Sequence, residues 1–288
     1  PSVTIGLPCH NAADTVGWAL QSVLAQTFGD WELVAVDDGS TDATPEILAQ
    51  VDDARVRVVR HHEQAGLAAR LNEIADQASG DLLARMDADD IMFPERIERQ
   101  VQFFAQQPET DLLGTGIVSI DRENRVSGVR FTPETVSAAR RIFSADVLFH
   151  PTVMGRSRWF LEHRYDVSLR RCEDFELWCR TAGQARIRNL TEPLLFYREA
   201  GQLDWLKYAE DSRLTRAIIR RHGPSRIGRG RSLRLGWGRR CKDVVYWLLF
   251  RLGRGGQAVA LRNTGLSQAQ ERYYEQRLRT AVRGPVGT

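Results

Sequence analysis

The sequence predicts an α/β protein, with a mostly parallel, Rossmann-like sheet flanked by helices and a basic helical C-terminal extension. Two observations predict this class. Apolar runs typical of strands alternate four times with segments of helical periodicity in the first 106 residues, which indicates parallel strands joined by right-handed crossovers. Residues 201–288 hold 19 Lys and Arg against 6 Asp and Glu, a net +13, whereas residues 1–200 hold 21 against 31, a net −10. An acidic body is therefore followed by a basic tail.

The first hundred residues predict four strand–helix units. Asp14 is expected to cap the first helix, and Asp42 or Thr44 the second, which has Pro45 near its first turn. Gly80 is expected to end the third helix. The expected strands are 3–7, 31–36, 55–60 and 82–86, and the expected helices begin near residues 16 and 44 and span 67–78 and 94–106.

The pattern changes after Leu112. Two alternating segments around a polar turn predict a β-hairpin, and less regular elements follow it. The expected elements are strands 113–120 and 126–131, a helix 133–143, a segment 149–154 that leads into another strand, a helix beginning at Cys172, a strand 194–197 and a helix 203–221 that His222-Gly223-Pro224 ends.

Two acidic loops follow predicted strands. They are Asp37-Asp38-Gly39-Ser40-Thr41-Asp42 and Asp87-Ala88-Asp89-Asp90. Because each follows a strand of a parallel sheet, both are expected at the carboxyl edge, where open α/β sheets bind ligands. Carboxylate oxygens suit Mg²⁺ or Mn²⁺ shared with substrate phosphates. The alternative for either loop is a solvated turn that caps the next helix.

Several classes of protein are excluded by composition. The longest apolar run is 244–250, which is too short to span a bilayer, since a helical span needs about 20 residues. No basic segment followed by an apolar one opens the chain, so we expect a cytoplasmic protein. The four cysteines are scattered without CxxC spacing, which favours reduced thiols over a zinc site or a disulfide framework.

Seven features in chain order carry a resemblance to a known family. They are Pro8-x-x-Asn11, Gln26-Thr27-Phe28-x-x-Trp31-Glu32-Leu33, the 37–42 loop, Asn72, the 87–90 loop, His150-Pro151-x-x-Met154 and Glu173-Asp174-x-x-Leu177-Trp178. Over residues 2–198 the chain resembles the family 2 glycosyltransferases, whose fold is named GT-A. The resemblance implies a catalytic domain at 1–199, with a nucleotide-binding half (1–110) and an acceptor half (111–199), before the extension at 200–288.

The resemblance assigns donor and metal contacts position by position. Asp38 resembles the residue that reads the nucleotide base, and Pro8 and Asn11 resemble part of the nucleotide wall. Since a carboxylate accepts the N–H of uracil, this favours a UDP-sugar donor. Asp87 resembles the first Asp of the DXD motif, which contacts ribose or metal. Asp89 resembles the second, a direct ligand of Mn²⁺ or Mg²⁺ on the diphosphate.

The resemblance also implies the reaction. Asp174 resembles the catalytic base that takes the proton of the acceptor hydroxyl. One base with direct displacement inverts the anomeric centre, whereas retention by double displacement would need a nucleophilic carboxylate. The segment 202–205 lacks the Gln-x-x-Arg-Trp motif of processive members, so a single hexosyl or N-acetylhexosaminyl addition is expected. The acceptor class implied is a glycan or lipid-linked glycan of bacterial surface polysaccharide synthesis.

Five further residues are candidates for supporting roles. Asp37 and Asp90 are expected to support their loops. Asn72 is a candidate for substrate contact, with polar packing as the alternative. His150 is expected near the site, with a structural role as the alternative. Glu173 either orients the base or is only a charge at a helix N-terminus.

The basic tail has several interpretations. Six arginines and no acid lie between Ser225 and Arg240, ahead of the Trp- and Tyr-containing apolar segment. This suits peripheral binding of 225–254 to an anionic membrane, at its inner face. The alternative is a helix packed on the catalytic domain or in a homodimer. Nucleic-acid binding is not expected, because no known motif accompanies the arginines.

Two other functions compete with sugar transfer. A sugar-1-phosphate nucleotidyltransferase would need a Gly-rich, basic signature near the first strand, which Pro8-Cys9-His10-Asn11 does not provide. A non-catalytic, sugar-nucleotide-binding assembly subunit is the second alternative, and the intact Asp89 and Asp174 argue against it.

Overall fold

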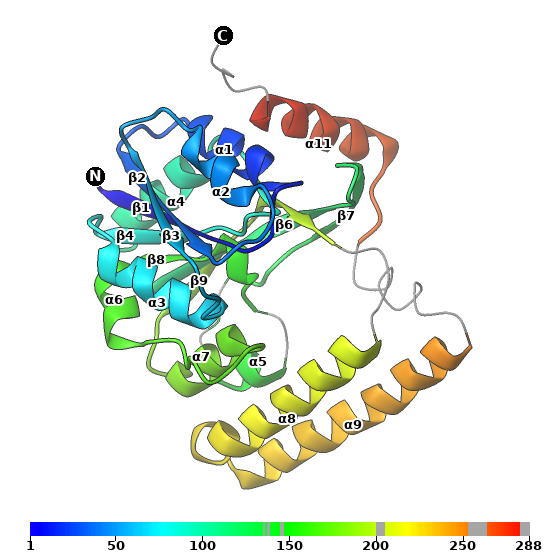
Figure 1. Cartoon of the computed structure of the whole chain (residues 1–288). Helices are drawn as coiled ribbons and strands as arrows, with labels where there is room; N and C mark the ends of the chain where they lie inside the picture. Colours follow the sequence, from blue (N-terminus) through cyan, green and yellow to red (C-terminus); the bar gives the residue numbers. More distant parts are fainter. Residues whose placement is uncertain (135, 137–138, 145–146, 200–204, 253–263, 283–288) are drawn as a thin grey trace.

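The computed structural model describes residues 1–134, 136, 139–144, 147–199, 205–252 and 264–282. Within these residues, nine strands form one sheet in the order β3-β2-β1-β4-β8-β6-β9-β5, with β7 paired to β6 (Figure 1). The strands are β1 (Val3–Cys9), β2 (Trp31–Asp38), β3 (Val56–His61), β4 (Leu82–Arg85), β5 (Ile91–Met92), β6 (Leu112–Ile120), β7 (Val126–Arg130), β8 (Met154–Arg156) and β9 (Ile187–Arg198).

The four strands predicted for the first half are confirmed as a parallel unit. β1 pairs in parallel with both β2 and β4, and β2 pairs in parallel with β3. Every residue of β1 is buried, as expected of a parallel strand covered on both faces. The helices that join these strands are α1 (Val16–Leu24), α2 (Thr44–Ala49) and α3 (Leu67–Gln77), and α4 (Arg96–Gln106) follows after β5.

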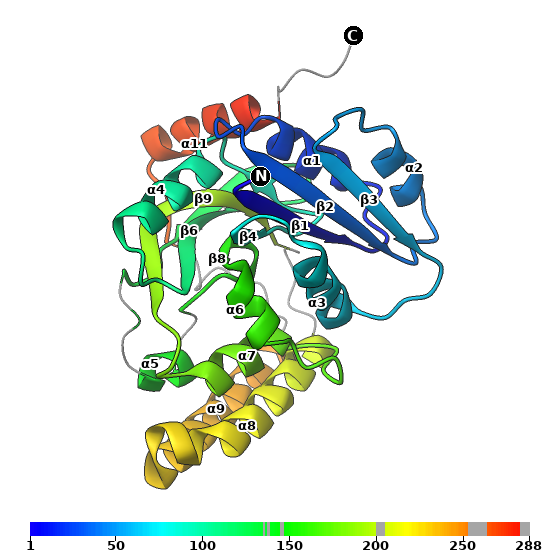
Figure 2. The ribbon, with the colours of Figure 1, turned by 90° about the vertical axis from the view of Figure 1, so that its left-hand side faces the viewer.

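Helices cover both faces of the sheet. One apolar cluster joins α1, α2 and α4 to the sheet, and another joins α3 to the helices of the acceptor half (Figures 1 and 2). Gly6 in β1 permits the close approach of α3, because a Cβ atom there would lie 2.6 Å from Cγ2 of Ile74. α3 therefore packs directly on β1.

The acceptor half extends the sheet with mixed pairing. β8 runs antiparallel to β4 and β6, β7 forms the predicted hairpin with β6, and β9 runs parallel to β6. The helical elements are α5 (Ala139–Ser144), η1 (His150–Thr152), α6 (Ser157–Glu162) and α7 (Glu173–Thr181).

The basic C-terminal part is helical, as predicted, and its described helices pack at two ends of the molecule. α8 (Trp205–Ile227) and α9 (Arg229–Arg251) form an antiparallel hairpin beside α5 and α7 (Figures 1 and 2). α11 (Gln268–Ala281) lies at the other end, where Tyr274 meets Phe93 edge-on with ring centroids 6.4 Å apart. The division into domains at residue 199 stays a prediction.

The segment 149–154 leads into a strand as expected, but the strand begins only at its last residue. A 3-10 turn at His150–Thr152 precedes β8, which starts at Met154, because Pro151 lacks the N–H that a central strand needs. Three other expectations were wrong. Asp14 does not cap α1, whose N-cap is Thr15 without a side-chain bond, and the N-cap of α2 is Ala43 and not Asp42 or Thr44. α8 does not end at His222 but continues to Ile227.

Close packing between the hairpin helices explains why α8 continues through Gly223 and Pro224. A Cβ atom at Gly223 would lie 2.5 Å from Oγ of Ser232 in α9. That hydroxyl donates to the carbonyl of Ile219, one turn earlier in α8. Tertiary contact with α9 therefore overrides the local helix-breaking signal. Parts of the predictions for 133–143, 202–205, 203–221 and 225–254 fall outside the described residues.

Candidate active site

Three carboxylates gather where the chain leaves β4. One oxygen of each of Asp87, Asp89 and Asp90 lies within 4.8 Å of the others. Arg85, the buried last residue of β4, holds Asp87 by two bonds, at 2.6 Å from Nη2 to Oδ1 and 2.9 Å from Nη1 to Oδ2. The two predicted metal ligands and Asp90 therefore form one cluster at the sheet edge, on a rigid support.

The electrostatics of this cluster fit a divalent cation. Burial and the neighbouring charge of Asp87 raise the pKa of Asp89 to about 6. Burial and repulsion from Asp89 raise the pKa of Asp90 well above its usual value. Oδ1 of Asp90 accepts the N–H of Arg198, whereas Oδ2 is buried without a partner. Clustered hard oxygens with an unsatisfied carboxylate suit Mg²⁺ or Mn²⁺, whose charge would offset this repulsion.

A cavity of about 500 Å³ opens beside the end of β2. Asp38 lines it, and its carboxylate accepts the N–H groups of Ala65 and Gly66, each at 2.8 Å, and Nε of Arg70 at 2.6 Å. Pro8 also lines this cavity. Arg70 is buried.

The 37–42 loop is held by side chains from two strand ends. Asn11 has a left-handed backbone, with φ of 48°, and its Oδ1 accepts the N–H of Thr41 at 2.8 Å. Oδ1 of Asp37 accepts the N–H of Ser40 at 3.2 Å. Oδ1 of Asp42 accepts the N–H of Thr44 at the start of α2. Asn11 thus fixes the loop of Asp38 and is not among the residues lining the cavity of Asp38.

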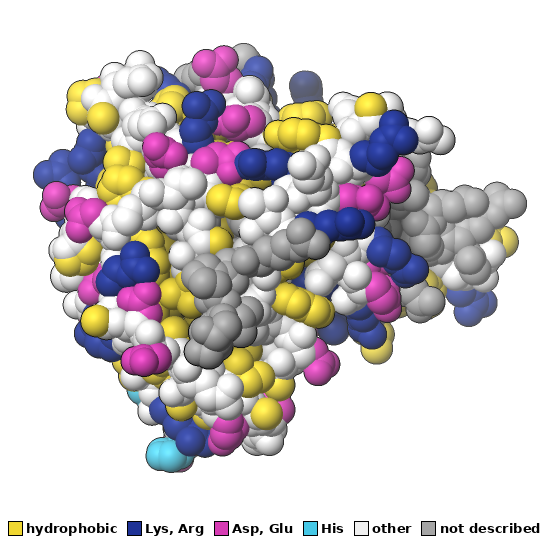
Figure 3. All heavy atoms as spheres, turned by 90° about the horizontal axis from the view of Figure 1, so that it is seen from above, with side chains coloured by type: hydrophobic (Ala, Val, Ile, Leu, Met, Phe, Trp, Pro, Cys, Tyr) yellow, Lys and Arg dark blue, Asp and Glu magenta, His cyan; other side chains and the backbone are white. Residues whose placement is uncertain are grey.

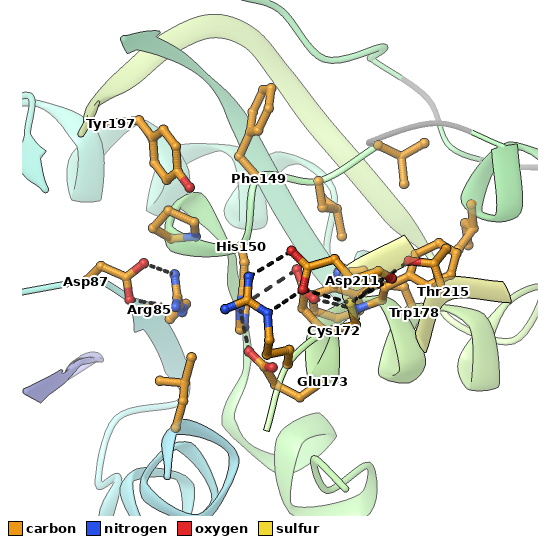
Figure 4. Close-up of a pocket in the computed structure, with 18 of the residues that line it drawn as sticks. Arg85, Asp87, Phe149, His150, Cys172, Glu173, Trp178, Tyr197, Asp211 and Thr215 are labelled. Atoms are coloured by element: carbon orange, nitrogen blue, oxygen red, sulfur yellow. Dashed lines mark hydrogen bonds and ion pairs between the residues drawn. The ribbon is translucent and has the colours of Figure 1, made fainter. Parts of the chain in front are cut away.

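A second cavity, of about 530 Å³, lies between the acidic cluster and the acceptor half. Asp87 and Arg85 lie on one side of it, and His150 and Glu173 lie on the other (Figure 4). Asp174 also lines this cavity. Arg170 lines both cavities and therefore lies at their junction.

Glu173 and Asp174 differ in environment at the start of α7. The side chain of Asp174 is 32% exposed, whereas that of Glu173 is 9% exposed. Burial and the charge of Asp174 raise the pKa of Glu173 to about 7. Asp174 lies in the first turn of α7, where the helix dipole favours an ionised carboxylate. Both carboxylates line the second cavity, and Asp174 is the more exposed of the two.

His150 connects the two carboxylates to the protein interior. Its Nδ1 lies 3.9 Å from Oε1 of Glu173 and 4.0 Å from Oδ2 of Asp174. Its Nε2 lies 2.9 Å from the hydroxyl of Tyr165. Burial and the charge of Arg85 lower the pKa of His150 well below its usual value, which favours the neutral imidazole. Asn72 bonds both backbone groups of Tyr165, which fits its alternative role in packing.

Sequence reasoning missed the contribution of the C-terminal hairpin. Asp211 and Thr215 of α8 and Arg239 of α9 line the second cavity. Asp211 pairs with Arg171 at 2.7 Å between Oδ2 and Nη2. No local signal marks these residues, because only the packing of α8 on α7 brings them to the site. Arg85 had a signal, since it immediately precedes the acidic loop.

The sequence matches a known family of enzymes. The family model for glycosyl transferase family 2 matches residues 4–164, more than half of the chain. The chain belongs to glycosyl transferase family 2. The putative glycosyltransferase EpsE of Bacillus subtilis is 34% identical over 206 residues, which is 69% of this chain and 73% of EpsE.

A second relative carries a more specific name. It is the UDP-Glc:alpha-D-GlcNAc-diphosphoundecaprenol beta-1,3-glucosyltransferase WfgD of Escherichia coli. WfgD is 26% identical over 176 residues, which is 61% of this chain and 68% of WfgD. Relatives of this glycosyltransferase thus include enzymes of bacterial polysaccharide biosynthesis.

Solved structures share the GT-A fold. The mannosyltransferase PcManGT of Pyrobaculum calidifontis, in complex with GDP-Man and Mn²⁺, has a TM-score of 0.60 and 16% identity over 98% of this chain and 85% of its own. S. aureus TarS in complex with UDP has a TM-score of 0.60 and 21% identity over 76% of this chain. The matched region is 65% of that TarS chain. Among the described residues, no helix is long and apolar enough to cross a membrane.

Proposed function

We propose that this glycosyltransferase moves a hexosyl or N-acetylhexosaminyl group from a UDP-sugar to a hydroxyl of a glycan or lipid-linked glycan, with inversion. The observation that carries the proposal is the cavity between the 87–90 cluster and Asp174. A donor diphosphate bound beside the 87–90 cluster and an acceptor hydroxyl bound beside Asp174 would meet within this cavity.

The donor side of the proposal uses both strand ends. Asp38 and Pro8 would line the nucleotide site, with Asn11 and Asp37 fixing the loop, and Asp87 would meet the ribose or the metal. Asp89 and Asp87 would hold Mn²⁺ or Mg²⁺, with Asp90 behind them. When bound, such an ion stabilises the charge that develops on the leaving diphosphate. Arg170, at the junction of the two cavities, would contact the same diphosphate.

The acceptor side uses Asp174 as the base. As the acceptor oxygen attacks the anomeric carbon, its proton passes to the Asp174 carboxylate and the bond from that carbon to the diphosphate breaks, which releases UDP. The exposure of Asp174 supports this role over Glu173, whose raised pKa leaves it partly protonated near neutral pH. His150 and Glu173 would orient Asp174 from behind.

The relatives support the choice of substrates. The name of WfgD specifies a UDP-sugar donor and a diphosphoundecaprenol acceptor. The structure of TarS was solved with UDP. PcManGT was solved with GDP-Man and Mn²⁺, so a guanine nucleotide is the first alternative donor. We propose action at the cytoplasmic face of a membrane, where a lipid-linked acceptor would be met.

Product analysis tests this function. The protein is incubated with Mn²⁺, a panel of UDP-sugars and a short-chain polyprenyl-diphosphate glycan, and UDP release and product anomeric configuration are measured. We expect metal-dependent UDP release and a product of opposite configuration to the donor. A retained configuration would contradict the single-base mechanism. Nucleotide binding without turnover on any donor–acceptor pair would favour the non-catalytic assembly subunit.

A further inference from the structure

An apolar stripe runs along an exposed face of α9. Its large members are between 47% and 69% exposed, and they recur every three or four residues, as one face of a helix requires. The members of this stripe, here named the α9 stripe, are Leu233, Trp237, Cys241, Val244, Val245, Leu248 and Leu252. Soluble surfaces rarely expose continuous apolar patches of this kind without a partner.

Basic side chains border the α9 stripe. Residues 205–252 contain thirteen Lys and Arg against three Asp and Glu. Two of the three acids point inward: Asp243 bonds Ser212 and Arg216 of α8, and Asp211 bonds Arg171. The exposed rim of the stripe is therefore almost purely cationic. The exposed basic residues of α9 are Arg229, Arg231, Arg234, Arg240, Lys242 and Arg251.

A groove between α8 and α9 continues the stripe. It has a volume of about 740 Å³, and every charged residue among those described as lining it is an arginine. Leu233 and Trp237 belong to both the groove and the stripe, and Arg240 lies 5.8 Å above the Trp237 ring. The arginines that line this groove are Arg213, Arg216, Arg220, Arg229 and Arg240.

The face that carries α11 looks different. Figure 3 looks down on this face, where acidic and basic side chains are interspersed and apolar ones are scattered. It therefore contrasts with the α8–α9 hairpin, where arginines gather beside exposed apolar side chains.

We propose that the α9 stripe and the arginine groove bind the surface of an anionic lipid bilayer. The apolar side chains would enter the boundary between headgroups and acyl chains, and the arginines would contact lipid phosphates. A bilayer matches both halves of the surface, the apolar stripe and its cationic rim. α9 carries too many charges to cross the membrane, so it would lie along it.

The inner side of the same hairpin reaches the active site. Arg239 of α9 and Thr215 of α8 line the cavity that contains Asp174. A bilayer on the outer face of α9 would therefore lie next to the wall where an acceptor enters, and a membrane-borne acceptor phosphate would meet Arg239. This use of the surface rests on the function proposed above, whereas lipid binding itself does not.

Co-sedimentation with vesicles tests the proposal directly. The whole chain is mixed with vesicles of phosphatidylglycerol and phosphatidylcholine, or of phosphatidylcholine alone, without donor or acceptor. We expect at least about tenfold stronger partitioning into the anionic vesicles, because each surface arginine adds attraction to acidic lipid. Salt is expected to weaken this partitioning.

Two variants assign the binding to the hairpin. Trp237→Glu/Leu248→Glu places charge in the stripe, and Arg231→Gln/Arg234→Gln removes charge from its rim. The matched controls on α11 are Tyr273→Glu, at a 55% exposed position, and Arg272→Gln/Arg279→Gln. We expect each hairpin variant to lose at least about tenfold in partitioning and each control to bind as wild type, all with unchanged circular dichroism.

Distinct outcomes would overturn the proposal. Wild-type protein that stays in the supernatant with both vesicle types would refute it, as would equal binding to neutral and anionic vesicles. A dimer in sedimentation velocity that Trp237→Glu/Leu248→Glu dissociates, without vesicle binding, would assign the face to a second copy of the chain. UDP titration of the same variants separates the two proposals, because these substitutions lie outside both active-site cavities.

Discussion

The two cavities of this glycosyltransferase are built in different ways. The cavity of Asp38 is formed by residues close to strand ends of the first 70 residues, with one segment, 167–170, added from the acceptor half. The cavity of Asp174 collects residues from β4, η1, α7, β9, α8 and α9, which are spread from position 67 to position 239. The donor side is therefore encoded locally, whereas the acceptor side depends on long-range packing. We therefore expect a substitution at Asp174 to lower the rate of transfer, and a substitution beside Asp38 to lower the stability of the fold.

The largest effect is expected at Asp174. We expect Asp174→Asn to lower transfer by about 10²- to 10⁴-fold, since a positioned general base contributes that much. UDP affinity should not change, because Asp174 lies across the cavity from the 87–90 cluster. Steady-state assays and UDP titration measure the two quantities. The matched control is Glu162→Gln, an exposed carboxylate of the acceptor half, and near-normal turnover of Asp174→Asn would remove Asp174 as the base.

The donor side should respond through stability. Arg70→Met breaks the buried pair with Asp38, whose side chains are 9% and 5% exposed, and should lower the free energy of unfolding by about 3–5 kcal/mol. UDP affinity should fall with it. Arg55→Met breaks the more exposed pair with Asp53 in the same half and should cost no more than about 1 kcal/mol. Urea denaturation compares the two, and equal losses would contradict the structural role of the Asp38–Arg70 pair.

Glu173 makes the acceptor side sensitive to pH. Its folded pKa of about 7 lies above the ordinary value of 4.5, so the native state holds this proton more tightly than the unfolded state. Stability is therefore lost as pH rises from about 4.5 to 7.

Removing this ionisation should remove that loss. As pH rises through this range, the free energy of unfolding of Glu173→Gln should increase relative to that of the wild type by on the order of 1–3 kcal/mol. Urea denaturation at several pH values measures the difference. A difference between variant and wild type that does not change with pH would show that Glu173 ionises normally.

The donor side was largely predictable from sequence. Apolar runs that end in acidic residues predicted the carboxyl edge of the sheet, and Asp38, Asp87 and Asp89 do lie at that edge. The alternation of strands and helices predicted the parallel pairing of the first four strands. The continuation of α8 through Pro224 was not predictable, because it depends on the packing of Ser232 against Gly223, which no local pattern records. The 3-10 turn at His150 had a local signal in Pro151.

The hairpin shows the same limit on the acceptor side. The charge asymmetry predicted that the tail has a distinct surface, but Asp211 and Arg239 reach the cavity only because α8 packs on α7. The roles proposed for individual residues remain predictions until they are measured.

The central claim is a metal-dependent nucleotide diphosphate site at the 87–90 cluster. Calorimetric titration of UDP into the protein with Mn²⁺ and then with EDTA tests it most directly. We predict binding with Mn²⁺ that weakens at least about tenfold in EDTA and in Asp89→Asn, because even the loss of a group that supports a metal ligand costs about 10- to 100-fold in metal affinity. Binding of GDP in place of UDP would change the donor only. Nucleotide binding that is unaffected by EDTA, or no binding of any nucleotide, would contradict the account.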